Sequence, residues 1–161
     1  MKRPFTSARR SCVHLVLALT AALVSPALPT RAAPSQQEAI TIVTEKPRGP
    51  VVGTFATSGA FADSGLLVTE SVQFSAISAP FGVITHVVQR FEGALGTFTL
   101  HAQIIDTLTD DPNLSLDQGT WVIVDGTGAY ATLHGTGDVT GTVDDAADLI
   151  TRVFTGTVHL K

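Results

Sequence analysis

The chain has 161 residues, of which 44% are hydrophobic and 15% are charged, and its formal net charge is −4. This length fits one domain with an appendage and is short for two ordinary domains. The hydrophobic content excludes disorder over most of the chain, because disordered segments combine low hydrophobicity with dense charge. The sequence contains no metal-binding cluster, phosphate-binding loop or nucleophile elbow, so its motifs name no reaction and no catalytic residue.

The N-terminus predicts a cleavable signal peptide. Four basic residues among the first ten precede an apolar stretch of about 13 residues. This stretch is shorter than the roughly 20 residues of a membrane-spanning helix, and Pro26 follows it, so we expect no lasting membrane anchor. We place the signal peptide at residues 1–32, with cleavage after Ala32, and the folded domain at residues 33–161. The predicted location is therefore secreted or periplasmic.

Loss of this leader changes both the cysteine content and the charge. Cys12, the only cysteine, lies in the leader, so the mature protein has no disulfide even in a compartment where disulfides persist. Residues 33–161 contain five basic residues against fourteen acidic ones, a formal charge of −9. Such a surface repels phosphate backbones, so nucleic acid is not an expected partner.

From residue 39 onward the sequence predicts only β-strands. Runs of Val, Ile, Thr and Phe are separated by short turns rich in Gly and Asp, without a helical period. The predicted strands are residues 39–44, 51–58, 65–77, 83–91, 96–108, 119–124, 133–143 and 149–160. Short connections make consecutive strands antiparallel. The composition of residues 109–118 is typical of a loop, which we expect to form a mobile rim.

Alternation with a period of two predicts which side chains face the core. In the strand at 96–108 the apolar face holds Phe98, Leu100, Ala102 and Ile104. In the strand at 65–77 it holds Leu66, Val68, Glu70, Val72 and Phe74. In the last strand it holds Ile150, Arg152, Phe154, Gly156, Val158 and Leu160. The last two faces therefore each contain one charged residue.

A sheet with one apolar face either packs against a second sheet or closes on itself. Closure removes the exposed edges that invite aggregation, so we favour a closed form over a sandwich. The predicted fold is all-β, a single antiparallel β-barrel of about eight strands, preceded by the signal peptide. A barrel of this size has an interior that side chains fill, or nearly fill, leaving room for one small ligand.

The most distinctive segment is residues 119–137, GTWVIVDGTGAYATLHGTG, which predicts a strand, a tight turn and a second strand. An aliphatic strand leads into Gly-Thr-Gly, an aromatic residue follows two positions later, and a strand punctuated by glycine comes next. In this combination the segment resembles the dirigent proteins and the allene oxide cyclase family. The resemblance covers residues 119 to about 143 well and the last strand acceptably. Trp121 and Asp125 depart from the dirigent pattern.

The resemblance implies an eight-stranded barrel whose interior binds a small lipophilic molecule without a cofactor and fixes its conformation. Holding a reactive conformer supplies rate and selectivity without much catalytic machinery, so the lack of catalytic motifs does not exclude this function. The related barrels associate through their outer faces, so the resemblance also allows a homo-oligomer. The predicted ligand-binding residues are Glu70, Phe74, Phe98, Leu100, Trp121, Tyr130, Arg152 and Phe154.

Three functions stay open from the sequence. The first is a secreted module that binds or steers a small lipophilic molecule. The second is a cofactor-independent cyclase or isomerase of the allene oxide cyclase type, in which Glu70 or Arg152 polarises the substrate. The third is a structural or surface-association protein with a filled barrel. The first two functions need a cavity of at least about 300 Å³. Glu70 and Arg152 either form the polar end of this cavity or reach solvent at twisted strand ends.

The four histidines of residues 33–161 show no HxH or HxxxH spacing. A zinc or copper site would need these residues to converge in the fold, which the sequence does not show. The spacing of the aspartates around residues 106–117 likewise matches no known calcium-binding loop. We therefore expect no metal and no cofactor.

Overall fold

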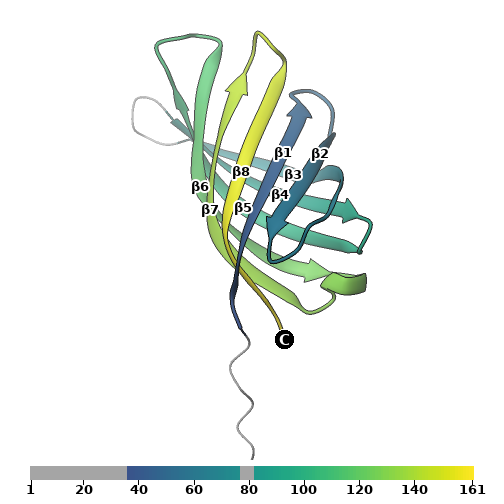
Figure 1. The fold of residues 1–161 in the computed structure, drawn as a ribbon. Coiled ribbons are helices and arrows are strands. Elements are labelled where there is room, and N and C mark those ends of the chain that lie inside the picture. The colour runs from purple at the N-terminus through teal and green to yellow at the C-terminus, as the bar shows by residue number, and fades with distance from the viewer. Residues whose placement is uncertain (1–35, 77–81) are drawn as a thin grey trace, which may run out of the picture. The chain divides into compact units, whose positions relative to one another are not determined.

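The computed structural model describes residues 36–76 and 82–161, so the predicted signal peptide lies outside the described residues. Eight strands form one closed antiparallel barrel in which consecutive strands are neighbours and β1 pairs with β8 (Figure 1). This confirms the predicted all-β barrel and excludes the sandwich. The strands are β1 (Glu38–Pro47), β2 (Val52–Gly59), β3 (Ser64–Ala76), β4 (Gly82–Gly93), β5 (Thr97–Leu108), β6 (Leu114–Gly126), β7 (Leu133–Asp144) and β8 (Leu149–Leu160).

A short 3₁₀ helix, η1 (Gly128–Tyr130), connects β6 to β7. Across the described residues, no helix has the length and apolar character needed to cross a membrane.

Strand β6 begins earlier than its sequence predicts. The prediction of a loop over residues 109–118 is wrong for its second half, because β6 starts at Leu114 and pairs with both β5 and β7 from that point. Asp117 is opposite Asp106 on β5 and Gly141 on β7, and its side chain is buried inside the barrel. The polar residues of this segment are typical of a loop, but Ser115 and Asp117 face a polar part of the interior, while Gln118 is exposed.

A β-bulge changes the inward face of β3. The register between β3 and β4 shifts between Thr69 and Ser71. Before the shift Leu67 is fully buried while Leu66 is exposed, so the face predicted from alternation is wrong in this half of the strand. After the shift Phe74 lies opposite Thr85, a buried residue of β4. One extra residue in a strand inverts its alternation, which a strict period of two cannot anticipate.

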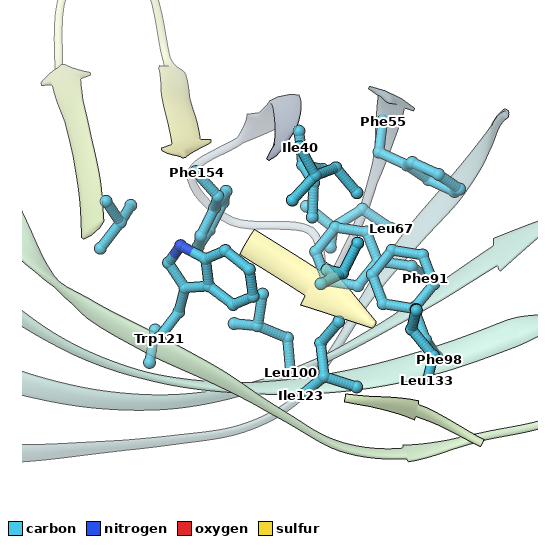
Figure 2. Close-up of a cluster of buried hydrophobic side chains, with 14 of the residues drawn as sticks. Ile40, Phe55, Leu67, Phe91, Phe98, Leu100, Trp121, Ile123, Leu133 and Phe154 are labelled. Carbon is cyan, nitrogen blue, oxygen red and sulfur yellow. The ribbon is translucent and has the colours of Figure 1, made fainter. Parts of the chain in front are cut away.

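One half of the barrel is packed with buried hydrophobic side chains, and several of them are aromatic (Figure 2). The rings of Phe91 and Phe98 stack with centroids 4.6 Å apart, and Phe55 meets both of them edge to face. Phe154 approaches Phe91 edge to face from β8. The inward face predicted for β5 is confirmed, because Phe98, Leu100, Ala102 and Ile104 are all buried.

The side chain of Trp121 is buried in the barrel, and its packing requires glycine at position 156. Its indole Nε1 donates to the carbonyl oxygens of Asp138, at 3.0 Å, and Thr155, at 3.2 Å. A Cβ atom added to Gly156 would lie 2.7 Å from the indole ring. Glycine at this position therefore leaves space for the buried tryptophan.

The aromatic end of the barrel is tied to its loops by Asp63. The hydroxyl of Tyr130 donates to its carboxylate at 2.8 Å, and the backbone N–H groups of Ser64, Ala94 and Leu95 donate to it as well. Desolvation opposes ionisation of Asp63, but these hydrogen bonds outweigh it and lower the pKa of the carboxyl. Desolvation of the phenol, together with its hydrogen bond to Asp63 and the negative charge of that carboxylate, raises the pKa of Tyr130.

Candidate ligand-binding cavity

The other half of the barrel is open and contains a cavity of about 360 Å³. Its lining comes from the ends of β1, β3, β5 and β7 and the starts of β4, β6 and β8, which all meet at this mouth. The lining residues are Lys46, Arg48, Thr69, Val72, Phe74, Val83, Thr85, Val87, Asp106, Ser115, Val143, Ile150 and Arg152. The cavity exceeds the size that a ligand-binding barrel requires.

The apolar part of this lining includes Val72, Phe74, Val83, Val143 and Ile150. Phe74 is 72% exposed, although its register places it opposite the inward-facing Thr85. An exposed aromatic ring at a cavity mouth offers apolar contact area that no other part of the described chain covers.

The deeper wall contains a buried ion pair. The Nε atom of Arg152 donates to Asp117 Oδ2 at 2.7 Å, and the two side chains are only 8% and 0% exposed. Burial raises the pKa of Asp117 to about 7, and the neighbouring carboxyl of Asp106 adds to this increase, although Arg152 opposes it. The site therefore holds a carboxyl group that exchanges its proton near neutral pH.

Two further groups extend this polar wall. The hydroxyl of Thr85 donates to Asp106 Oδ2 at 2.5 Å. Lys46 Nζ donates to the carbonyl oxygens of Pro47, at 2.9 Å, and Pro50, at 3.1 Å. Desolvation and the positive charge of Arg152 lower the pKa of Lys46. Of the two alternatives for Arg152, the polar end of the cavity is therefore the one that the structure has, although its partner is Asp117 and not Glu70.

Several buried polar atoms in this lining or directly behind it have no hydrogen-bond partner among the described residues. They are Asp117 Oδ1, the hydroxyl of Thr69 and both amide atoms of Gln89. Gln89 is fully buried and lies opposite Thr69, which lines the cavity. An unpaired buried polar group costs about 1 to 3 kcal/mol, so such groups are commonly satisfied by water or a ligand. The inner wall is suited to receive a polar group.

The structure brings only two of the eight predicted ligand-binding residues to this cavity, Phe74 and Arg152. The others except Glu70 are buried in the barrel, namely Phe98, Leu100, Trp121, Tyr130 and Phe154. Glu70 is exposed beside the bulge and pairs with Arg90 at 3.5 Å, so its expected place in the pocket is corrected to the outer surface. Burying the carboxylate without a partner would be costly, and the bulge avoids this.

Sequence reasoning missed Lys46, Thr85, Asp106 and Asp117. Lys46 lies beyond the first predicted strand, which ends at residue 44, and Asp117 lies in the predicted loop at 109–118. These four residues could have been found from their positions. Each lies near the end of a strand, on the alternating face that also carries the inward apolar residues. Asp106, for example, continues the inward series of Phe98 to Ile104 along β5.

The aromatic end has a hollow of its own, with a volume of about 370 Å³. Its lining is mainly apolar and includes Phe61, Leu95, Tyr130, Leu133 and Val158. It contains no buried charge of the kind found beside the opposite mouth, as judged over the described residues. Binding there would rest mainly on apolar contact, although Gln36, Glu38 and His159 also line the hollow.

No protein-family model matches the sequence, and comparison with curated proteins and with solved structures also finds no match. Within the described residues there is no group of three or more His, Cys, Asp or Glu side chains placed to hold a metal ion. The fold and cavity define the class of this protein as a small up-and-down antiparallel barrel. One half is packed with aromatic residues and the other opens around a buried Asp–Arg pair.

Proposed function

We propose that the protein is an exported barrel that binds a small lipophilic molecule carrying one polar group. The observation that carries this proposal is the open cavity of about 360 Å³, which combines an apolar mouth with a buried ion pair. The mouth supplies area for the apolar body of the ligand, and the inner wall supplies hydrogen-bonding groups. Pockets of this composition, mostly apolar with a few placed polar groups, are typical of small-molecule sites.

The polar wall gives the ligand a preferred orientation. Arg152 and Thr69 both line the cavity, and the Thr69 hydroxyl has no hydrogen-bond partner among the described residues. A polar group of the ligand that contacts these two side chains would leave the apolar remainder against Phe74 and its neighbours. A purely hydrocarbon ligand would leave the Thr69 hydroxyl unpaired and would bind less tightly.

A cofactor-independent cyclase or isomerase is the second candidate function. Its support is Asp117, whose pKa of about 7 suits a general acid or base, next to Arg152, which can stabilise negative charge that develops on a substrate. Glu70 is exposed outside the cavity, so it is not placed to polarise a substrate there. A filled barrel without a ligand is the weakest reading, because the filling extends over only one half of the interior.

Native mass spectrometry of protein purified from its own host tests the binding proposal. A lipophilic molecule should copurify with the wild-type protein. It should be lost when Ser115 and Val143, which are cross-strand partners at the mouth, are both changed to Trp. The matched control is Val124→Trp, because Val124 is exposed on β6 and does not line the cavity. Equal retention by the blocked and control proteins would disprove binding in this cavity.

An assay of turnover separates the two candidate functions. If the protein is a binding module, Asp117→Asn changes affinity for the copurified molecule, and no product forms with wild type or variant. If it is an enzyme, the variant loses turnover but retains substrate. Circular dichroism of each variant verifies that the barrel has formed.

A further inference from the structure

The barrel register brings two histidines together on its outer surface. His134 of β7 and His159 of β8 are direct cross-strand partners. The residues that flank them along the strands, including Leu133 and Val158, are buried inside, so the two imidazoles project outward. Both are partly buried, and their rings lie nearly parallel, with centroids 5.6 Å apart and planes inclined by 24°.

This spacing is close to what a shared metal ion requires. Two imidazole nitrogens bound at about 2.0 to 2.1 Å to one tetrahedral ion place their ring centroids about 5 Å apart. Directly opposed residues of antiparallel strands have Cβ atoms about 4.5 to 5.5 Å apart, so rotation of the two stacked rings about their side-chain bonds can turn one nitrogen of each toward a common ion. We propose that His134 and His159 form a binding site for a divalent first-row transition metal ion.

The surroundings of the pair favour a small cation. The two histidines lie in a shallow depression of about 180 Å³, whose other lining residues are Gln37, Val122, Ile123, Gly135, Thr136 and Thr157. None of these is basic, so no positive charge in the lining repels an ion. The excess of acidic residues in residues 33–161 raises the local concentration of cations further.

The ligand set selects the class of metal. Imidazole nitrogen binds copper, zinc and nickel, whereas magnesium and calcium require oxygen ligands. The Irving–Williams order places Cu²⁺ above Ni²⁺ and Zn²⁺ at such a site. Two protein ligands leave the remaining positions to water, so the ion should exchange readily and remain accessible to other molecules. This site is on the outer surface and is independent of the cavity proposed to bind a lipophilic molecule.

Titration of the tag-free protein with Cu²⁺ tests the proposal, with binding followed by calorimetry. We expect one site that is tighter than any other, and a loss of affinity of about tenfold or more in His134→Gln and in His159→Gln, because each variant removes one arm of the chelate. His86→Gln and His101→Gln are matched controls, since these histidines are exposed on other strands and lack a histidine partner in the strand register. Mg²⁺ should give no binding at the same concentrations.

A second measurement needs no variant. Zn²⁺ should protect His134 and His159 together from modification by diethyl pyrocarbonate, read residue by residue by mass spectrometry, while His86 and His101 react as before. The proposal is overturned if the two variants weaken Cu²⁺ binding no more than the controls, or if Zn²⁺ protects the four histidines equally.

Discussion

Replacement of Arg152 by Met removes the positive partner of Asp117 while keeping an unbranched side chain of similar length. The arginine is 8% exposed and the aspartate fully buried, so water cannot take over the lost interaction. Breaking a buried ion pair by removing one partner costs about 3 to 5 kcal/mol, because the remaining charge is uncompensated. We expect a destabilisation in this range at alkaline pH.

The pH dependence of this loss follows from the pKa of Asp117. In the wild type the pKa is about 7, above the value of about 3.9 in an unfolded chain, so this carboxyl favours folding at acid pH. That contribution disappears as pH rises from about 4 to 7. Without Arg152 the pKa rises further, and the variant continues to lose about 1.4 kcal/mol per pH unit above pH 7. The gap between wild type and variant should therefore widen to about 3 kcal/mol near pH 9.

Urea denaturation at pH 5, 7 and 9 measures this gap, and a thermal melt provides an independent reading. A loss of about 3 kcal/mol corresponds to a fall of about 10 °C in melting temperature for a domain of this size. The double variant Arg152→Met, Asp117→Leu removes both charges and should recover most of the lost stability. A cost for Arg152→Met that is below about 1 kcal/mol at pH 9, or that does not change between pH 5 and 9, would refute the reasoning.

Three further predictions concern the packed half of the barrel. Phe98→Ala should cost about 3 to 5 kcal/mol in urea denaturation, since Phe98 is fully buried between other rings; a cost below about 1 kcal/mol would mean that the cluster repacks freely. Gly156→Ala should cost at least about 1 to 3 kcal/mol and red-shift the fluorescence of Trp121, because the added Cβ would clash with the carbonyl oxygen of Thr136 and with the indole ring; an unchanged spectrum would contradict the contact with the indole. Wild-type stability should fall as pH drops through the lowered pKa of Asp63, and melts of Asp63→Asn from pH 2 to 6 should show a shallower acid decline, whereas identical slopes would exclude this carboxyl as a cause.

The strands whose alternation is uninterrupted were predictable from sequence. Along β5 each second residue from Phe98 to Ile104 is buried, and along β8 Arg152, Phe154 and Val158 share the inward face as expected. Successive side chains of a strand point to opposite faces, so a hydrophobic pattern with a period of two indicates which face is packed against the core. The confirmed barrel closure follows from the same pattern, since eight one-sided strands with short turns have few other ways to cover their edges.

The cavity was less predictable because its residues break the rule that inward means apolar. Asp117 was assigned to a loop, although it is inside β6 and pairs with Arg152. Its partner lies 35 residues away, and only the three-dimensional register brings the two together. The bulge beside Glu70 is invisible to a periodic reading for a similar reason, since an inserted residue is recognised only against the strand opposite.

The ladder between β1 and β8 has a consequence for how the molecule forms. Seven of the eight ladders join strands that follow one another, whereas this one joins the two extremes of the barrel sequence. Formation of this ladder therefore carries a larger loop-closure entropy than any of the other seven, and a sheet that lacks it is still open. Until that step a growing sheet exposes two free edges that can recruit another chain, and after it neither edge remains. Pairing of β1 with β8 therefore removes the free edges that would make the chain vulnerable to misassembly.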